Sequence, residues 1–266
     1  MKGDEYRMRK TRSFSLIGWT SLILIAVLVF MGQEGCDLEK GSNQTNLKKD
    51  SGEYSRVSII IEKKESGGWA PLPAEQITPD FRLYEDGTVI YKKYIEEQNP
   101  TKIKFMIEHL TNSQISELLR FIQEQRFFEM QDYYPEYSMD AVFSTLTVRG
   151  ENGLKTVTVG DVDLGPKSFA KICEKLDRFS IPTAIKYHPK IIILFVSTLP
   201  QANLKEFKTW PVASVNLEQA IKLKKIVLEG NDLGQVMKVM ENQLIAFFSF
   251  RGKVYQVVTK IHLPDE

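Results

Sequence analysis

The chain has 266 residues, of which 42% are hydrophobic and 26% are charged. This composition provides enough apolar material for a folded core and excludes a chain that is disordered throughout. The 35 basic and 34 acidic residues nearly cancel, so no overall positive field would recruit nucleic acid. Two cysteines cannot build a disulfide framework or a four-thiolate zinc site.

The amino terminus has the pattern of a membrane anchor. Five basic residues and two acidic ones precede an uncharged segment, residues 13–33, whose centre is strongly apolar. A helix of about 20 such residues spans the hydrocarbon layer of a bilayer, and a basic flank stays in the cytoplasm. We therefore expect residues 1–33 to be an anchor or signal segment that contacts the membrane through residues 13–33. The rest of the chain is then extracytoplasmic.

A second way of attachment is lipidation of Cys36. Gly35-Cys36 is similar to the end of a bacterial lipoprotein signal, in which the cysteine carries the lipid. In that pattern Leu usually lies three residues before the cysteine and small residues precede it, whereas this chain has Gln33 and Glu34. Both an uncleaved anchor and a lipid at Cys36 would tether the same domain outside the same membrane.

Residues 34–55 have almost no apolar residues and predict a flexible linker. An apolar run at residues 57–61 predicts the first strand. Residues 81–84 and 88–91 flank Asp86-Gly87, which is a strong signal for a hairpin turn. Alternating apolar residues at 103–107 predict a third strand.

A helix should follow at Thr111, which can cap it together with Gln114. Its apolar positions repeat at helical spacing through Ile122, and Phe127-Phe128 should close it against the core. A hairpin is expected over residues 141–160, with Val142, Ser144, Leu146 and Val148 on one face, and a second helix after Pro166. The apolar stripe of that helix contains Cys173, which we predict to be a buried core thiol.

The last third predicts strands at 191–196 and 225–228, a helix at 217–223, a helix capped by Asn231, and a hairpin over 244–258. The predicted fold class is α+β, with antiparallel sheets from successive hairpins packed by two to four amphipathic helices, after one N-terminal membrane helix. We divide the folded part into a first α+β domain, residues 56–190, and a smaller α+β subdomain, residues 191–266.

One resemblance follows from these elements. The hairpin FRLYEDGTVIY at residues 81–91, a helix ending in Phe127-Phe128 and a closing Tyr255…Leu263-Pro264 resemble uncharacterised bacterial envelope proteins that are membrane-anchored or lipid-anchored. The resemblance covers most of residues 80–264. It implies a location outside the cytoplasm and no activity.

Known catalytic and cofactor-binding spacings are missing from the sequence. The three histidines are far apart, and neither phosphate-binding loops nor nucleophile signatures occur. Asp161-Val162-Asp163 begins like a calcium loop but does not continue as one, so Asp161 and Asp163 are expected to turn the chain. No metal and no cofactor are therefore expected. Asp140, Asp161 and Asp163 are the candidate catalytic residues of an alternative function, a carboxylate-dependent extracytoplasmic hydrolase.

The segment Tyr133-Tyr134-Pro135-Glu136-Tyr137 is the most unusual local composition. Its tyrosines could form an amphipathic contact surface or cover the edge of the core. Tyr133, Tyr134 and Tyr137 are the candidate binding residues. The sequence favours a non-enzymatic domain that binds an envelope protein or another surface component, and it leaves the molecular function open.

Overall fold

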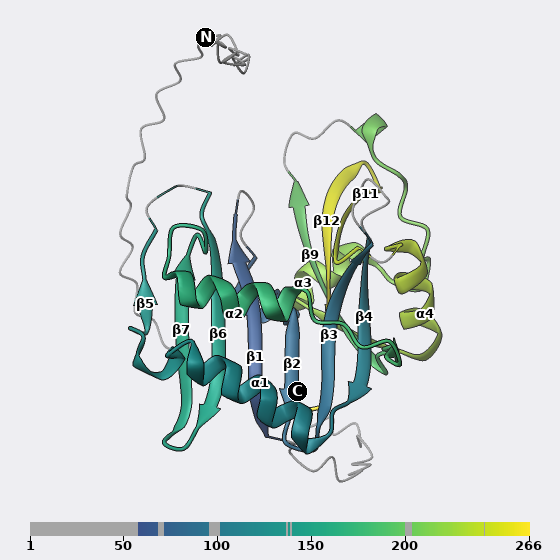
Figure 1. The fold of residues 1–266 in the computed structure, drawn as a ribbon. Helices are drawn as coiled ribbons and strands as arrows, with labels where there is room; N and C mark the ends of the chain where they lie inside the picture. Colours follow the sequence, from purple (N-terminus) through teal and green to yellow (C-terminus); the bar gives the residue numbers. More distant parts are fainter. Residues whose placement is uncertain are drawn as a thin grey trace, which may run out of the picture. The chain divides into compact units, whose positions relative to one another are not determined.

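The computed structural model describes residues 58–68, 72–95, 102–136, 138, 140–199, 204–241 and 243–266. All of them belong to one compact unit, Ser51–Glu266. This part of the chain is an α+β fold with two sheets and four α-helices (Figure 1). The predicted membrane segment, residues 13–33, the linker 34–55 and Cys36 lie outside the described residues. Within the described residues, no helix is long and apolar enough to cross a membrane.

The first sheet has eight strands in the order β5-β7-β6-β1-β2-β3-β4-β8. Neighbouring strands are antiparallel, except that β5 runs parallel to β7. The strands are β1 (Ile59–Gly67), β2 (Phe81–Tyr84), β3 (Thr88–Ile95), β4 (Lys102–His109), β5 (Tyr133–Tyr134), β6 (Val142–Gly150), β7 (Gly153–Gly160) and β8 (Ile185–Lys186). The pairing of β1 with both β2 and β6 joins the two predicted hairpins into one sheet.

The hairpin between β2 and β3 forms where the sequence predicted it. Gly87 has a φ of 88° and its backbone N–H donates to the carbonyl of Tyr84 over 3.0 Å. The carboxylate of Asp86 accepts from the backbone N–H of Thr88, which fixes the turn from the other side. A positive φ favours glycine because the residue has no Cβ.

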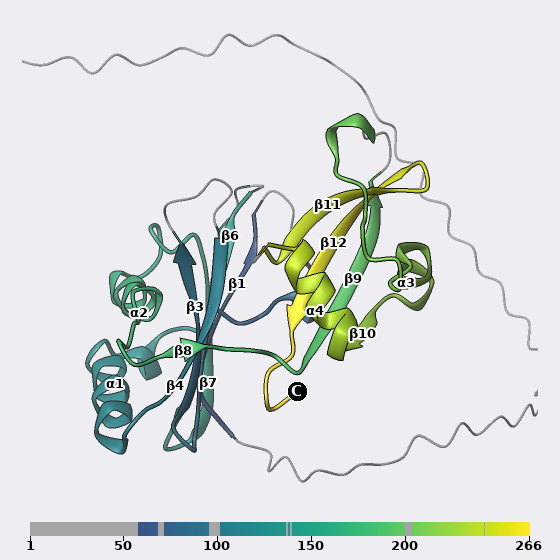
Figure 2. The same ribbon diagram turned by 90° about the vertical axis from the view of Figure 1, so that its right-hand side faces the viewer.

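Two helices, α1 (Asn112–Glu124) and α2 (Lys167–Asp177), cover one face of the first sheet (Figure 1). Figure 2 shows both on the same side of it. The predicted capping box is present at Thr111 and Gln114, and Ile122 and Cys173 are buried in the core under these helices. The prediction of a core thiol at Cys173 is confirmed.

The second sheet has the order β10-β9-β12-β11, and all its pairs are antiparallel. Helices α3 and α4 pack against it. The elements are β9 (Ile191–Leu199), α3 (Leu217–Leu223), β10 (Ile226–Glu229), α4 (Gly230–Val239), β11 (Ile245–Phe250) and β12 (Lys253–Ile261), with 3-10 turns at η1 (Ala74–Gln76), η2 (Phe127–Glu129) and η3 (Leu204–Glu206).

The two sheets share a third apolar cluster. Side chains of β2, β3 and β4 that point away from α1 and α2 pack there against the end of β12 and the segment after it. Its buried members are Tyr84, Ile90, Phe105, Ile261 and Leu263. Because strand side chains alternate between faces, the same strands contribute both to this cluster and to the core under the helices.

Two local predictions are wrong. Asn231 does not cap α4, because the helix already begins at Gly230 and Glu229 is its N-cap residue. Phe128 is 38% exposed, and its ring lies edge-on to the buried ring of Phe127 with centroids 5.5 Å apart.

Candidate functional site

The three candidate carboxylates lie at the open end of the β6–β7 hairpin, opposite its turn. Asp140 precedes β6 and is exposed. Asp161 follows β7 with a φ of 53°, and its carboxylate accepts the backbone N–H of Asp163 over 3.1 Å. This contact is the local turn that aspartate side chains favour. Asp163 itself is exposed. Within the described residues, no group of three His, Cys, Asp or Glu side chains could hold a metal ion.

Of the two tyrosines of this segment that the structure describes, Tyr133 is the exposed one. The residue is 53% exposed, and its ring stacks on the ring of Phe143 in β6, with centroids 6.5 Å apart and planes inclined by 9°. Gly160 allows this arrangement, because a Cβ at that position would lie 2.8 Å from the ring of Phe143 and 2.6 Å from Cβ of Glu136. We call Tyr133 and Phe143 the aromatic platform.

The other two tyrosines differ from Tyr133. Tyr134 is partly buried against the core under α1 and α2, and its hydroxyl accepts the backbone N–H of Gln131 over 3.0 Å. Tyr137 lies outside the described residues. Of the two described tyrosines, therefore, one presents a surface to solvent and the other covers the core.

A cavity of about 390 Å³ lies between the two sheets, within the size range of small-molecule sites. We call it the inter-sheet cavity. Glu65 and Lys92 line it from β1 and β3, together with Ile103 of β4. Ile245 of β11 and Val258 of β12 line the opposite side. Aliphatic and polar residues both line the cavity, and its charged groups come from the first sheet.

Lys92 forms an ion pair with Asp80, which is only 7% exposed. Burial raises the pKa of Asp80 above its ordinary value, and the neighbouring ammonium of Lys92 offsets only part of that effect. Oδ1 of Asp80 accepts from Lys92, while Oδ2 has no hydrogen-bond partner. A buried carboxylate oxygen without a partner is costly, so the pair is incompletely satisfied.

Lys63 of β1 forms two further ion pairs, one of them with Asp177 of α2. Nζ of Lys63, whose side chain is 1% exposed, lies 2.7 Å from Oε1 of Glu65 and 2.6 Å from Oδ1 of Asp177. Burial alone would lower the pKa of Lys63, but the two carboxylates outweigh it and leave the pKa raised. Together with Asp80 and Lys92 these groups are three carboxylates and two ammonium groups, which we call the five-charge network.

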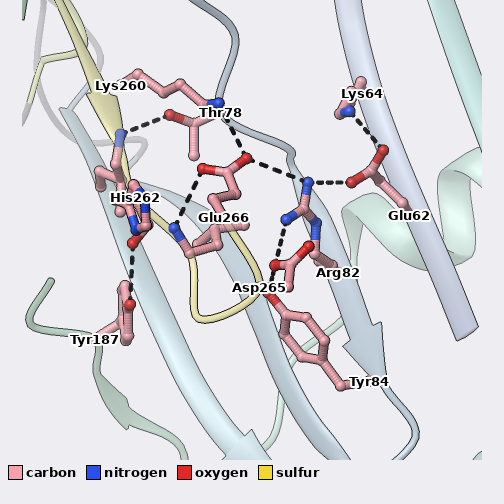
Figure 3. A network of polar contacts seen from close by, with 12 residues as sticks. Glu62, Lys64, Thr78, Arg82, Tyr84, Tyr187, Lys260, His262, Asp265 and Glu266 are labelled. Atoms are coloured by element: carbon pink, nitrogen blue, oxygen red, sulfur yellow. Dashed lines mark hydrogen bonds and ion pairs between the residues drawn. The ribbon is translucent and has the colours of Figure 1, made fainter. Parts of the chain in front are cut away.

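A separate polar network fixes the last residues of the chain on the first sheet (Figure 3). Arg82, whose side chain is 4% exposed, contacts Glu62 of β1, Asp265 over 2.6 Å and Glu266 over 3.6 Å. The hydroxyl of Tyr84 donates to the same Asp265 oxygen over 2.6 Å. We call this the tail network. It joins β1 and β2 to the segment after β12.

The tail network keeps its arginine charged. Burial alone lowers the pKa of Arg82, but Glu62, Tyr84 and Asp265 outweigh it, and the pKa lies above its ordinary value. Burial, followed by the hydrogen bond to Asp265, raises the pKa of Tyr84, so that hydroxyl stays protonated and donating. Each partner therefore holds the protonation state that the contact needs.

The sequence interpretation did not single out Asp80, Arg82 or Lys92. A signal was available for the Asp80–Lys92 pair, because the predicted hairpin places Phe81 opposite Tyr91, and the next position pairs Asp80 with Lys92. No comparable signal exists for the contact of Arg82 with Asp265, which are 183 residues apart in the sequence.

No family model matches this chain, and no curated protein matches it.

Proposed function

We propose that this chain is a membrane-tethered, extracytoplasmic domain that binds an envelope component without catalysing a reaction. The observation that carries the proposal is the aromatic platform. Tyr133 presents 53% of its surface to solvent while its ring is held against Phe143. A rigid exposed tyrosine loses little conformational entropy on binding and buries a large amphipathic surface, which is why tyrosine is enriched at protein interfaces.

The test is a chemical crosslinking pull-down from native membranes with the full-length chain. Tyr133→Ala should lose the captured partner. The matched control is Phe247→Ala, which removes another exposed aromatic ring, 41% exposed, from β11 in the second sheet. Both variants are first compared with the wild type by thermal unfolding. A partner that Tyr133→Ala retains at the wild-type level contradicts the platform as the binding surface.

The same preparation tests the alternative function. A hydrolase would turn over an envelope substrate and would lose that activity on Asp140→Asn or Asp161→Asn. Turnover with this loss of activity would replace the binding proposal.

The proposed tether rests on the uncharged segment 13–33 and the basic flank before it. A reporter enzyme that is active only outside the cytoplasm, fused after residue 266, should be active. The Cys36→Ser variant separates the two kinds of attachment. If residues 13–33 are an uncleaved anchor, the wild type and Cys36→Ser keep the same length in the membrane fraction. If Cys36 carries a lipid, the signal segment is removed from the wild type and stays on Cys36→Ser.

A further inference from the structure

The inter-sheet cavity is distinct from the aromatic platform, and its lining carries information about the ligand. Aliphatic side chains of both sheets, including Ile103, Ile245 and Val258, surround a volume of about 390 Å³. A cavity of this size that combines aliphatic side chains with a few polar groups is typical of small-molecule sites. The apolar part predicts a ligand with a small hydrophobic body.

The charged side of the cavity predicts the head group. Glu65 and Lys92 line the cavity directly. The ammonium of Lys92 is already paired with Asp80, and that of Lys63 is paired with Glu65 and Asp177. Since the five-charge network has three carboxylates for two ammonium groups, one negative charge has no matching cation among these residues.

The hydrogen bonds lead to the same conclusion as the charges. Glu65 gives one oxygen to Lys63 and keeps 39% of its side chain exposed. Oδ2 of Asp80 is buried without a partner. Of these two carboxylates Glu65 lines the cavity, so Glu65 has capacity to accept from a donor there, and an anionic ligand would meet the excess of negative charge of the five-charge network.

We propose that the inter-sheet cavity binds a small amphiphile that has a protonated amine as its head group and an apolar body. The amine donates to Glu65 and supplies the missing positive charge of the five-charge network. The apolar body packs between Ile103 of the first sheet and Ile245 of the second. The ligand thus contacts both sheets, and it should stabilise the arrangement in which the cavity forms.

The test uses three probes of the same shape and different charge: 2-phenylethylamine, 2-phenylethanol and phenylacetate. Binding to the full-length chain in lipid nanodiscs is measured by ligand-observed NMR titration, with empty nanodiscs as the blank. We expect saturable binding of the amine and at least about tenfold weaker binding of phenylacetate, because Lys92 is already paired with Asp80 and Glu65 is the charged lining residue left to pair with a ligand.

Two variants locate the site. Ile245→Trp places a larger side chain in the cavity and should weaken amine binding at least about tenfold. Its control is Val227→Trp on β10, a 53% exposed position that does not line the cavity, which should bind as the wild type does. Glu65→Gln removes the negative charge at a partly exposed position and should reduce the preference for the amine over the alcohol.

Three results overturn the proposal: no saturable binding of the amine, equal binding of amine and phenylacetate, or amine binding that Ile245→Trp leaves unchanged. A thermal unfolding curve of each variant verifies that it is folded. If Glu65→Gln is unfolded, the comparison of Ile245→Trp with Val227→Trp still decides the location. Neither result depends on Tyr133, so this proposal and the platform proposal fail separately.

Discussion

Replacing Arg82 by methionine tests the tail network, since methionine keeps much of the length of the side chain and removes its charge. In the wild type Arg82 contacts Glu62, Asp265 and Glu266 while only 4% of its side chain is exposed. The variant leaves three carboxylates near one another without their shared cation. Lys64 and Lys260 still contact two of them, over 2.6 Å and 3.0 Å.

The expected loss of unfolding free energy follows from burial. Removing one partner of a buried ion pair costs roughly 3–5 kcal/mol, because the remaining charge is left without compensation. The three carboxylate side chains keep 11%, 16% and 19% of their surface exposed, so water solvates them in part. We therefore expect the lower end of that range, about 3 kcal/mol.

The assay is urea unfolding of the full-length chain, followed by tryptophan fluorescence. Trp210, buried in the core of the second sheet, is one reporter, because its indole N–H donates to the carbonyl of Val215 and unfolding breaks this hydrogen bond. The matched control is Arg178→Met, which removes an arginine 80% exposed in its pair with Glu174. Such a surface pair contributes about 0.5 kcal/mol or less. A loss below about 1 kcal/mol for Arg82→Met would show that the network contributes little to the fold.

Four further predictions concern the folded part of the chain. Gly87→Val should destabilise the protein by more than about 1 kcal/mol, and by more than the control Gly153→Val. Both glycines have a positive φ, but of the two only Gly87 would place a Cβ 2.6 Å from a backbone oxygen. Equal melting temperatures of the two variants would contradict this prediction. Ile122→Asp places a carboxylate in the core at a fully buried position, and a melting curve like that of the wild type would mean that the helix face is wrongly assigned. Cys173, whose thiol pKa burial raises to about 12, should resist alkylation in a variant without the other cysteine until denaturant is added; rapid labelling of the native protein would refute its burial. The pKa of Lys63 is raised in the folded state, so its protonated form contributes stability below the ordinary lysine value of 10.5, and this stability is lost as the pH rises through the folded-state pKa. The melting temperature of Lys63→Met should therefore fall less steeply with rising alkaline pH than that of the wild type. Equal slopes of melting temperature against pH would contradict the assignment.

Local signals in the sequence predicted local structure well. The capping box at Thr111, the turn at Gly87 and the buried face with Cys173 each depend on residues a few positions apart, and each is confirmed. The α+β class follows from the same signals. The membrane segment, the linker and the lipidation of Cys36 remain predictions.

Contacts between distant segments could not be predicted in this way. No periodicity indicates that β1 pairs with both β2 and β6, or that Arg82 lies against Asp265. Lys63 is buried because its strand runs under α2, where Asp177 supplies the counter-charge. Phe128 was expected to close the helix against the core because it is apolar, but its place in η2, after the end of α1, leaves 38% of it exposed.

The most direct test of the account is site-specific photocrosslinking in intact membranes. A photoreactive phenylalanine analogue replaces Tyr133 in one sample and Leu223, which is 57% exposed on α3, in the other. The account predicts a discrete crosslinked product from position 133 that is missing from position 223. No product from position 133, or the same products from both positions, would contradict a binding surface at the aromatic platform.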